Sequence, residues 1–296
     1  MAESTAWRPL ARNETLAEAR ARNIRDALAE DVGTGDRTAA LVPARPATAR
    51  LIVREDAVLC GTEWFAGVFA ALDPAVVVTW EAAEGAEIAA GSRVAEVRGD
   101  ARTLLTGERS ALNFLQLLSA TASVTRRWAR LIEGVSPNPR GCLVLDTRKT
   151  IPGLRLAQKH AVRVGGGANQ RLALWDGILV KENHIAAAGG VAAATRAALA
   201  AAADGISVQV EVERLDQLTE ALDAGAMSIL LDNFPPERMR EAVVLTGGRA
   251  LLEASGGITD ASIREIAATG VDRISIGALT KDVRATDYSM RIVAPA

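Results

Sequence analysis

The second half of the chain alternates short apolar runs with amphipathic segments. The apolar runs predict buried strands, and the segments between them have the three-to-four-residue periodicity of helices. The predicted strands are Cys142–Leu145, Ile178–Val180, Val208–Val212, Ile229–Leu231, Leu251–Leu252 and Arg273–Ile276. The predicted helices are Leu154–Arg163, Val191–Ala203, Leu215–Ala224, Pro236–Leu245 and Ala261–Ala268. Alternation at about 20-residue spacing predicts a parallel sheet of βα units. Six units, or seven with one that the pattern does not locate, favour a closed or nearly closed barrel.

The first half lacks this repeat and mixes elements. It predicts helices at Asn23–Glu30 and Thr62–Leu72, strands at Ala49–Val53 and Val76–Trp80, and helices at Thr103–Ala120 and Ser123–Gly134. Glycine turns, including Arg98-Gly99-Asp100, separate further short β segments. The breaker Ser136-Pro137-Asn138-Pro139 marks a boundary near residue 135. We therefore expect an α/β protein with an N-terminal domain (1–135) and a βα-barrel domain (136–280), with residues 281–296 a candidate for packing back on the first domain.

Composition narrows the functional classes. The 296 residues carry a net charge of −2, so no overall field attracts nucleic acid or an anionic membrane. No apolar run approaches the roughly 20 residues of a membrane span, and Met1–Arg12 lacks the apolar core of a secretory signal. Cys60 and Cys142 both lie in apolar runs with no metal-site spacing. They predict buried free thiols in a reducing cytoplasm.

Polar residues or glycines follow all six predicted strands. In strand order, they are Asp146, Arg148 and Lys149; Lys181, Glu182, Asn183 and His184; Glu211 and Glu213; Asp232 and Asn233; Glu253, Ser255, Gly256 and Gly257; and Gly277 and Ala278. In a βα barrel these carboxyl ends meet at one face, which carries the active site. Core packing does not explain such a series, so we expect a binding site there.

The charges at this face fall into two groups. Arg148, Lys149 and Lys181, joined by Arg171, form a predicted cationic wall suited to carboxylate or phosphate. Glu211 and Asp232 form an acidic pair that, beside phosphates, favours Mg²⁺.

Two glycine sites follow the last strands, at Ser255-Gly256-Gly257 and at Gly277-Ala278, where backbone N–H groups can approach a phosphate. His160 lies in a helical pattern and is expected to be structural, whereas His184 is a candidate site residue. The pattern predicts a barrel that binds a small anionic substrate and a phosphorylated sugar with Mg²⁺. It does not name the reaction.

The ordered motifs resemble one family, the quinolinate phosphoribosyltransferases. The motifs are Glu30-Asp31-Val32-Gly33, Gly35-Asp36, Gly107–Asn113, Asp146–Thr150 with Pro152-Gly153, Gly165–Gly167, Lys181–Ile185, Leu231–Phe234, Glu253–Ile258 and Gly277–Thr280. The resemblance covers roughly residues 20–292. It implies an N-terminal open α/β sandwich, an incomplete seven-stranded βα barrel and a head-to-tail homodimer whose active sites are shared.

The resemblance also implies a reaction and roles. Quinolinate and phosphoribosyl pyrophosphate would give nicotinate mononucleotide, carbon dioxide and pyrophosphate, on the de novo route to NAD. By resemblance, quinolinate is bound by Arg148, Gln170, Arg171 and Lys181 and by Arg109 from the partner. Phosphoribosyl pyrophosphate is bound by Lys149, Lys181, Glu211, Asp232, Ser255, Gly256, Gly257, Gly277 and Ala278. Lys149, Glu211 and Asp232 would be catalytic, the last two also holding Mg²⁺ indirectly through pyrophosphate.

One position departs from the family pattern. Gln170 stands in Gly167-Ala168-Asn169-Gln170-Arg171, where the family usually has a histidine that lines the quinolinate pocket. Glutamine still donates a hydrogen bond to a carboxylate but carries no charge. The change is expected to affect ground-state binding by on the order of 1 kcal/mol.

Three other interpretations remain open from the sequence. One is a paralogue of the same fold, of the molybdenum-transport-associated type, with a different acceptor. Another is a Schiff-base aldolase with Lys149 or Lys181 as its nucleophile. The third is a nucleotide-sensing or purely structural barrel, against which the presence of Lys149, Glu211 and Asp232 argues.

Overall fold

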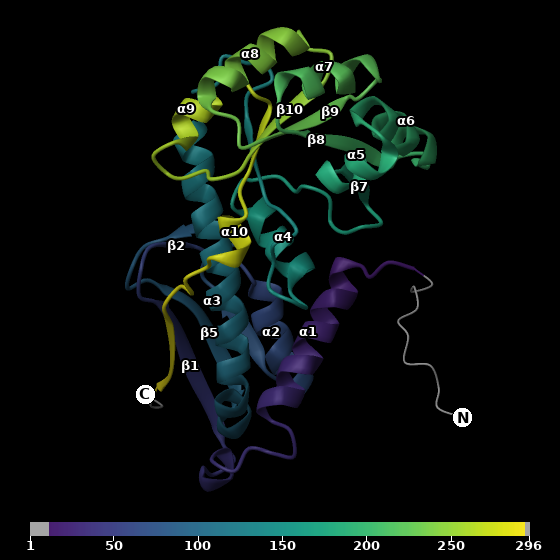
Figure 1. The fold of residues 1–296 in the computed structure, drawn as a ribbon. Helices are drawn as coiled ribbons and strands as arrows, with labels where there is room; N and C mark the ends of the chain where they lie inside the picture. Colours follow the sequence, from purple (N-terminus) through teal and green to yellow (C-terminus); the bar gives the residue numbers. More distant parts are fainter. Residues whose placement is uncertain (1–11, 294–296) are drawn as a thin grey trace, which may run out of the picture.

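A single long helix connects the two lobes of the protein. The computed structural model describes residues 12–293, so the predicted absence of a secretory signal falls mostly outside it. Helix α3 (Ala101–Ile132) runs from the lower lobe into the upper one (Figure 1). The prediction of two helices here was wrong. The hydroxyls of Thr121 and Thr125 bond to carbonyls four residues back, at 3.1 and 2.7 Å, so both threonines are accommodated within an unbroken helix.

The lower lobe contains an antiparallel sheet packed against helices. Its elements are α1 (Leu16–Asp31), the 3₁₀ helix η1 (Ala39–Leu41), β1 (Pro46–Val53), β2 (Ala57–Val58), α2 (Thr62–Leu72), β3 (Val77–Trp80), β4 (Glu87–Ile88), β5 (Arg93–Asp100) and β12 (Tyr288–Val293). The main sheet has the order β12-β1-β5-β3. Strand β12 pairs with β1 from Val53↔Tyr288 to Thr48↔Val293, so the C-terminal segment returns to this lobe. Strand β5 runs through Gly99, which the sequence pattern marked as a turn, and ends at Asp100, the N-cap of α3.

The upper lobe is an incomplete βα barrel. Its elements are β6 (Leu143–Leu145), α4 (Arg155–Val164), β7 (Gly177–Val180), α5 (Glu182–Ala188), α6 (Val191–Ala201), β8 (Ser207–Val212), α7 (Leu215–Asp223), β9 (Ser228–Asp232), α8 (Pro236–Thr246), β10 (Leu251–Ser255), α9 (Ile263–Ala267), β11 (Arg273–Ser275) and α10 (Ala278–Lys281). The parallel sheet has the order β6-β11-β10-β9-β8-β7. Ala168 forms a parallel bridge with Leu145 beyond β6. This isolated bridge marks a further extended segment beside β6, outside the six strands, which the sequence pattern could not locate because only one residue of it pairs.

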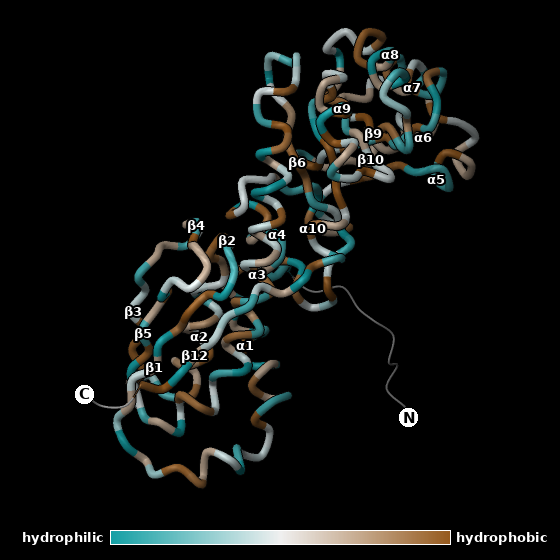
Figure 2. Tube along the Cα trace, turned by 90° about the vertical axis from the view of Figure 1, so that its left-hand side faces the viewer, coloured by the Kyte–Doolittle hydropathy of each residue, from teal (hydrophilic) through white to brown (hydrophobic). Residues whose placement is uncertain are grey.

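Two apolar cores hold the lobes, and α3 contributes to both. Leu104 and Leu115 lie in the lower core, whereas Trp128 and Ile132 lie in the upper one. Helix α4 also faces both cores and lies beside α3, where the lobes meet (Figures 1 and 2). The sharing of two helices between both cores couples the barrel to the antiparallel sheet.

The two cysteines differ in burial. Both are free thiols; Cys60 is buried as predicted, but Cys142 is only half-buried, so that part of the prediction was wrong. Cys142 lies just before the short strand β6, whose first residue, Leu143, is itself exposed. Within residues 12–293, no helix is long and apolar enough to cross a membrane.

Candidate active site

A cavity of about 700 Å³ opens at the carboxyl ends of the barrel strands. Its lining includes all but one of the residues to which the resemblance assigns substrate contacts: Arg148, Lys149, Gln170, Arg171, Lys181, Glu211, Asp232, Ser255, Gly256, Gly257, Gly277 and Ala278. The exception is Arg109, which lies exposed on α3 in the lower lobe. Parallel strands therefore bring together residues that are up to 130 positions apart in the chain.

The four predicted cations, Arg148, Lys149, Arg171 and Lys181, line one cavity, where their positive charges repel one another. Burial, together with the positive charge of Arg148, lowers the pKa of Arg171. Its Nη1 donates to the Gly177 carbonyl at 2.9 Å, which fixes the guanidinium at the start of β7. The Nε of Arg148 is buried and has no hydrogen-bond partner among the described residues. An unsatisfied donor beside other cations fits an anionic ligand that carries more than one acceptor group.

The acidic pair lies at the ends of β8 and β9. Glu211 is half-buried, and Lys181 Nζ lies 3.0 Å from its carboxylate. Burial raises the pKa of Glu211; the Lys181 ammonium opposes this shift and Asp232 adds to it. Asp232 accepts a hydrogen bond from the Asn233 amide at 2.9 Å. The pair places negative charge next to the cationic wall. Such a site suits a substrate in which an electron-deficient carbon lies near the carboxylates and phosphates lie near the cations.

The turn after β9 packs tightly on the turn after β10. Asn233 has a φ of 56°, which is uncommon for a residue other than glycine. A Cβ built on Gly256 would lie 2.1 Å from Asn233 Oδ1, so no side chain fits there. By contrast, a Cβ on Gly257, which lines the cavity, would meet nothing within 4 Å, although its φ of 58° disfavours other residues. Gly256 therefore makes room for the Asn233 side chain, whereas the phosphate contacts of both glycines stay a prediction.

Two buried residues support the loops that carry the cations. Gln158 accepts from the Ile151 N–H and donates to the Thr280 carbonyl, both at 2.8 Å. Thr280 Oγ1 in turn donates to the Lys149 carbonyl at 2.8 Å. The backbone of Lys149 is therefore fixed, while its side chain is exposed to the cavity.

The first residue of the Asp146–Thr150 motif is a support and not a ligand. Asp146 is fully buried, and its carboxylate accepts from Lys159 Nζ at 2.5 Å, Asn169 Nδ2 at 2.6 Å and the Gln170 N–H at 3.0 Å. Lys159 Nζ also donates to the Gln170 carbonyl at 2.8 Å. Burial raises the pKa of Asp146 and lowers that of Lys159, against their mutual attraction. This ion pair joins β6, α4 and the loop that carries Gln170 and Arg171.

Besides Asp146, four strand-end residues do not line the cavity: Glu182, Asn183, His184 and Glu213. His184 Nδ1 accepts from the Lys181 N–H at 3.0 Å, so its side chain caps the first turn of α5. It also lines a separate apolar hollow. The hypothesis that His184 is a site residue is not supported by this position. Glu213 is exposed beyond the end of β8, where its N–H donates to Gln217. It does not line the cavity because the strand ends before it.

Comparison with known families matches both lobes. Residues 34–119 match the N-terminal domain, and residues 121–291 the C-terminal domain, of quinolinate phosphoribosyl transferase. The chain belongs to the quinolinate phosphoribosyl transferase family. A relative from Mycobacterium leprae, named nicotinate-nucleotide pyrophosphorylase [carboxylating], is 41% identical; the match covers 90% of this chain and 95% of that one. A human protein of the same name is 39% identical, and the match covers 86% of each chain.

Solved structures carry the same fold. The nicotinate-nucleotide pyrophosphorylase from Francisella tularensis has a TM-score of 0.89 and 42% identity, over 95% of this chain and 100% of that one. A Pyrococcus furiosus enzyme of the same name has a TM-score of 0.67 at 17% identity, which shows a common fold alone. The predicted pairing of an N-terminal α/β sandwich with an incomplete barrel is confirmed by the quinolinate phosphoribosyl transferase structures.

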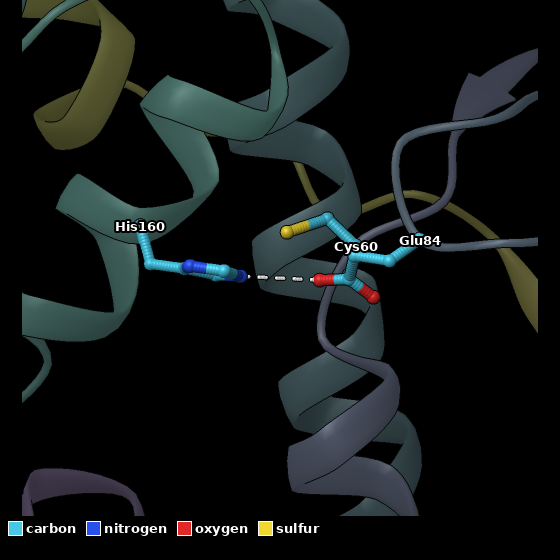
Figure 3. Close-up of side chains that lie close together, drawn as sticks. All are labelled: Cys60, Glu84 and His160. Atoms are coloured by element: carbon cyan, nitrogen blue, oxygen red, sulfur yellow. Dashed lines mark hydrogen bonds and ion pairs between the residues drawn. The ribbon is translucent and has the colours of Figure 1, made fainter. Parts of the chain in front are cut away.

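One cluster outside the cavity brings together three groups able to ligate a metal. The ligand atoms of Cys60, Glu84 and His160 lie within 4.8 Å of one another, and the His160 ring points at the Glu84 carboxylate (Figure 3). The carboxylate already accepts from the N–H groups of Gly61 and Thr62, the Thr62 hydroxyl, and His160. Burial and the Glu84 charge raise the pKa of the Cys60 thiol. The Glu84 acceptors are therefore occupied and the Cys60 thiol is protonated. The cluster caps the N-terminus of α2 and links α4 to the lower lobe.

Sequence reasoning placed Glu253 at a strand end but missed Gln209, a buried polar residue behind the cavity lining. Side chains alternate across a strand, so Gln209 shares the inner face of β8 with Glu211, two residues away. Likewise Glu253 shares the inner face of β10 with Ser255, and Arg273 that of β11 with Ser275. Gln209 and Glu253 are buried and bonded to each other at 2.9 Å. Counting back by two from the strand-end residue Glu211 would have found Gln209.

Proposed function

We propose that this chain transfers a phosphoribosyl group from phosphoribosyl pyrophosphate to quinolinate with loss of carbon dioxide. The products are nicotinate mononucleotide, carbon dioxide and pyrophosphate, in the de novo synthesis of NAD. The observation that carries the proposal is one cavity in which Arg148, Arg171 and Lys181 face Glu211 and Asp232 at the strand ends. The names of relatives at about 40% identity support the same activity.

The cationic wall suits quinolinate because that substrate is a pyridine dicarboxylate. Arg148 and Arg171 would each bind a carboxylate, and the Nε of Arg148, which has no hydrogen-bond partner within residues 12–293, would gain an acceptor. Lys181 would hold the ring near the second substrate, beside the glutamate with which it pairs at 3.0 Å. Gln170 would add a neutral donor.

Phosphoribosyl pyrophosphate would occupy the other side of the cavity. The 5-phosphate would lie on Gly256, Gly257 and Gly277, with Ser255 and Ala278 beside it. Glu211 and Asp232 would accept hydrogen bonds from the ribose hydroxyls. Lys149, exposed at the junction of the two groups of residues, would contact both substrates.

The donor set also fits Mg²⁺. Two carboxylates are too few for a complete protein cage, but Mg²⁺ usually binds through one or two carboxylates, waters and substrate phosphates. Glu211 and Asp232 would hold the ion by way of the pyrophosphate, and when bound it would neutralise charge on that group. Chelation by EDTA should abolish turnover, and added Mg²⁺ should restore it. Full turnover in EDTA would contradict this assignment.

The chemistry follows from position and charge. The pyridine nitrogen bonds to the anomeric carbon as the bond from that carbon to the pyrophosphate oxygen breaks, with the electron pair leaving on pyrophosphate. Glu211 and Asp232 stabilise the positive charge that develops on the ribosyl group, and Lys149 stabilises the leaving group. The pyridinium formed then accepts the electron pair released when the adjacent carboxylate leaves as carbon dioxide. A proton replaces it on the ring carbon.

We propose a homodimer in which Arg109 completes the partner's site. In support, Arg109 is exposed and lies outside its own chain's cavity. Leu105, one turn earlier on α3, is also exposed, and Leu41 of the adjacent η1 is 83% exposed. Apolar side chains beside an unused arginine fit a protein interface.

Mixing two inactive variants tests the shared site. In an Arg109→Ala and Lys149→Ala mixture, half of the dimers are hybrids and half of their sites are intact, so activity should recover to about a quarter of wild type. An absence of recovery after subunit exchange, verified by native mass spectrometry, would contradict a shared site.

We also propose a cytoplasmic location, which the two free thiols support.

A steady-state assay tests the reaction itself. Purified protein with phosphoribosyl pyrophosphate and Mg²⁺ should release carbon dioxide and pyrophosphate with quinolinate and should leave nicotinate unused. Turnover of nicotinate but not quinolinate, or of neither, would overturn the proposal in favour of a paralogue with another acceptor. Borohydride trapping of a lysine adduct with a carbonyl substrate would favour an aldolase instead.

A further inference from the structure

A chain of three polar side chains, one half-buried and two buried, runs behind the quinolinate side of the cavity. Gln170 Nε2 lies 2.6 Å from Gln209 Oε1, and Gln209 Nε2 lies 2.9 Å from Glu253 Oε2. Gln209 is 6% exposed and Glu253 is 1% exposed. They project from β8 and β10, which flank β9 in the sheet (Figure 1). Of the three, only Gln170 stands at a position to which the family resemblance assigns a substrate contact.

The direction of this chain is set at its inner end. Gln209 Nε2 donates to a carboxyl oxygen of Glu253, so the NH₂ group of Gln209 faces Glu253. Its carbonyl oxygen then faces Gln170, which must present its own NH₂ group in return. The Arg273 guanidinium lies nearby, with its Nε 4.0 Å from Glu253 Oε2. Amide orientation, which is ambiguous for an isolated glutamine, is therefore determined for both glutamines.

We propose that Gln209 and Glu253 are positioning residues that orient the Gln170 amide, leaving its second N–H to donate to a carboxylate of quinolinate. This inference rests on the proposed function. Without Gln209, the Gln170 amide could rotate and turn its carbonyl oxygen to the substrate carboxylate, where two acceptors repel. We call these three side chains, Gln170, Gln209 and Glu253, the relay. Where the family usually has a histidine that can carry charge, the relay supplies a neutral donor held in one orientation. Gln209 thereby becomes a determinant of affinity for quinolinate.

A double-mutant cycle tests the relay in the full-length protein. Gln209→Leu should raise the KM for quinolinate about tenfold, because one oriented hydrogen bond to a charged group is worth about 1.5 kcal/mol or more. The KM for phosphoribosyl pyrophosphate should stay within about twofold. In a Gln170→Ala background, Gln209→Leu should have no further effect on the quinolinate KM, because the group that it positions is already absent. Equal effects in both backgrounds, or no effect in either, would overturn the proposal.

Two further variants separate positioning from packing. Gln209→Glu keeps an acceptor for Gln170 and can share a proton with Glu253, so it should hold the quinolinate KM within about threefold of wild type. If Gln209→Glu instead behaves like a leucine substitution, the relay is wrong. This variant also decides the question if Gln209→Leu fails to fold. Thr195→Val is the control: it removes a buried hydroxyl elsewhere in the barrel, on α6, and should leave both KM values unchanged.

The wild-type protein in the same assay separates this inference from the proposed function. If wild type does not turn over quinolinate, the proposed function fails, and the relay, which depends on it, fails with it. If wild type is active and the cycle is additive, only the relay fails.

Discussion

Replacing Asp146 with asparagine removes the charge from a buried ion pair while conserving shape. Asp146 and Lys159 have side chains that are 0% and 2% exposed, with 2.5 Å between Oδ1 and Nζ. Removing one partner of a buried pair costs about 3–5 kcal/mol because the other charge stays buried and uncompensated. Asparagine also loses the acceptor for the Asn169 amide, or else turns its NH₂ group towards Lys159. We expect Asp146→Asn to lower the free energy of unfolding by about 3–5 kcal/mol and Tm by on the order of 10 °C.

The same substitution should weaken substrate binding. The Asp146 carboxylate accepts the Gln170 N–H at 3.0 Å, and Lys159 holds the Gln170 carbonyl at 2.8 Å. Loosening this loop should raise the KM for quinolinate about tenfold or more, because a displaced contact in a bound geometry is costly. Urea unfolding followed by tryptophan fluorescence measures the first effect, and steady-state kinetics measures the second.

A double substitution is the matched control. Asp146→Asn with Lys159→Met removes the stranded charge, and apolar replacement of a buried pair is often close to neutral. The double variant should therefore regain more than half of the lost stability while its quinolinate KM stays high. The reasoning is refuted if Asp146→Asn costs less than about 1 kcal/mol, or if the double variant is less stable than the single one.

Three further outcomes follow from the site and its supports. Lys149→Ala should abolish turnover and leave Tm within about 2 °C of wild type, because this side chain is exposed; full activity would show that the site is assigned wrongly. Gln170→His should keep quinolinate activity within about tenfold, since either side chain can donate to a carboxylate; a loss of several hundredfold would show a pocket rebuilt around glutamine. Burial alone would raise the pKa of Glu84, but hydrogen bonds from His160, the N–H groups of Gly61 and Thr62 and the Thr62 hydroxyl lower it from 4.5 to about 2. A depressed carboxyl pKa stabilises the fold above the unfolded value, so this contribution should be lost as pH falls from 4.5 to 2. Glu84→Gln should flatten that part of the curve of stability against pH, and an unchanged slope in acid unfolding would contradict the assignment.

The regular half of the fold could be predicted because its physics is local. Each barrel strand is a short apolar run between amphipathic helices, and the structure confirms six of them within a few residues. The further extended segment around Ala168 could not be found, because it pairs through a single bridge and has no apolar run. In the first half, Gly99-Asp100 resembles a turn in isolation, but pairing with β1 extends β5 through it. Tertiary contacts override local propensity at such positions.

Most of the cavity lining could be predicted for a related reason. Parallel strands place their carboxyl ends at one edge, so residues such as Lys181 and Asp232 meet whatever their separation in sequence. The direction in which a polar side chain points could not be predicted from the sequence. Asp146 belongs to the most informative motif, yet it turns inward to Lys159, and His184 turns to a backbone N–H. Those choices depend on partners that are distant in sequence.

A crystal structure with quinolinate and a non-hydrolysable phosphoribosyl pyrophosphate analogue tests the central claim most directly. The account predicts the two carboxylates of quinolinate against Arg148, Arg171 and Lys181, with the Gln170 amide donating to one of them. It predicts the 5-phosphate on Gly256, Gly257 and Gly277, and the pyridine nitrogen facing the anomeric carbon beside Lys149. Quinolinate bound outside this cavity, or the phosphate bound on the cationic wall with the glycines empty, would contradict it.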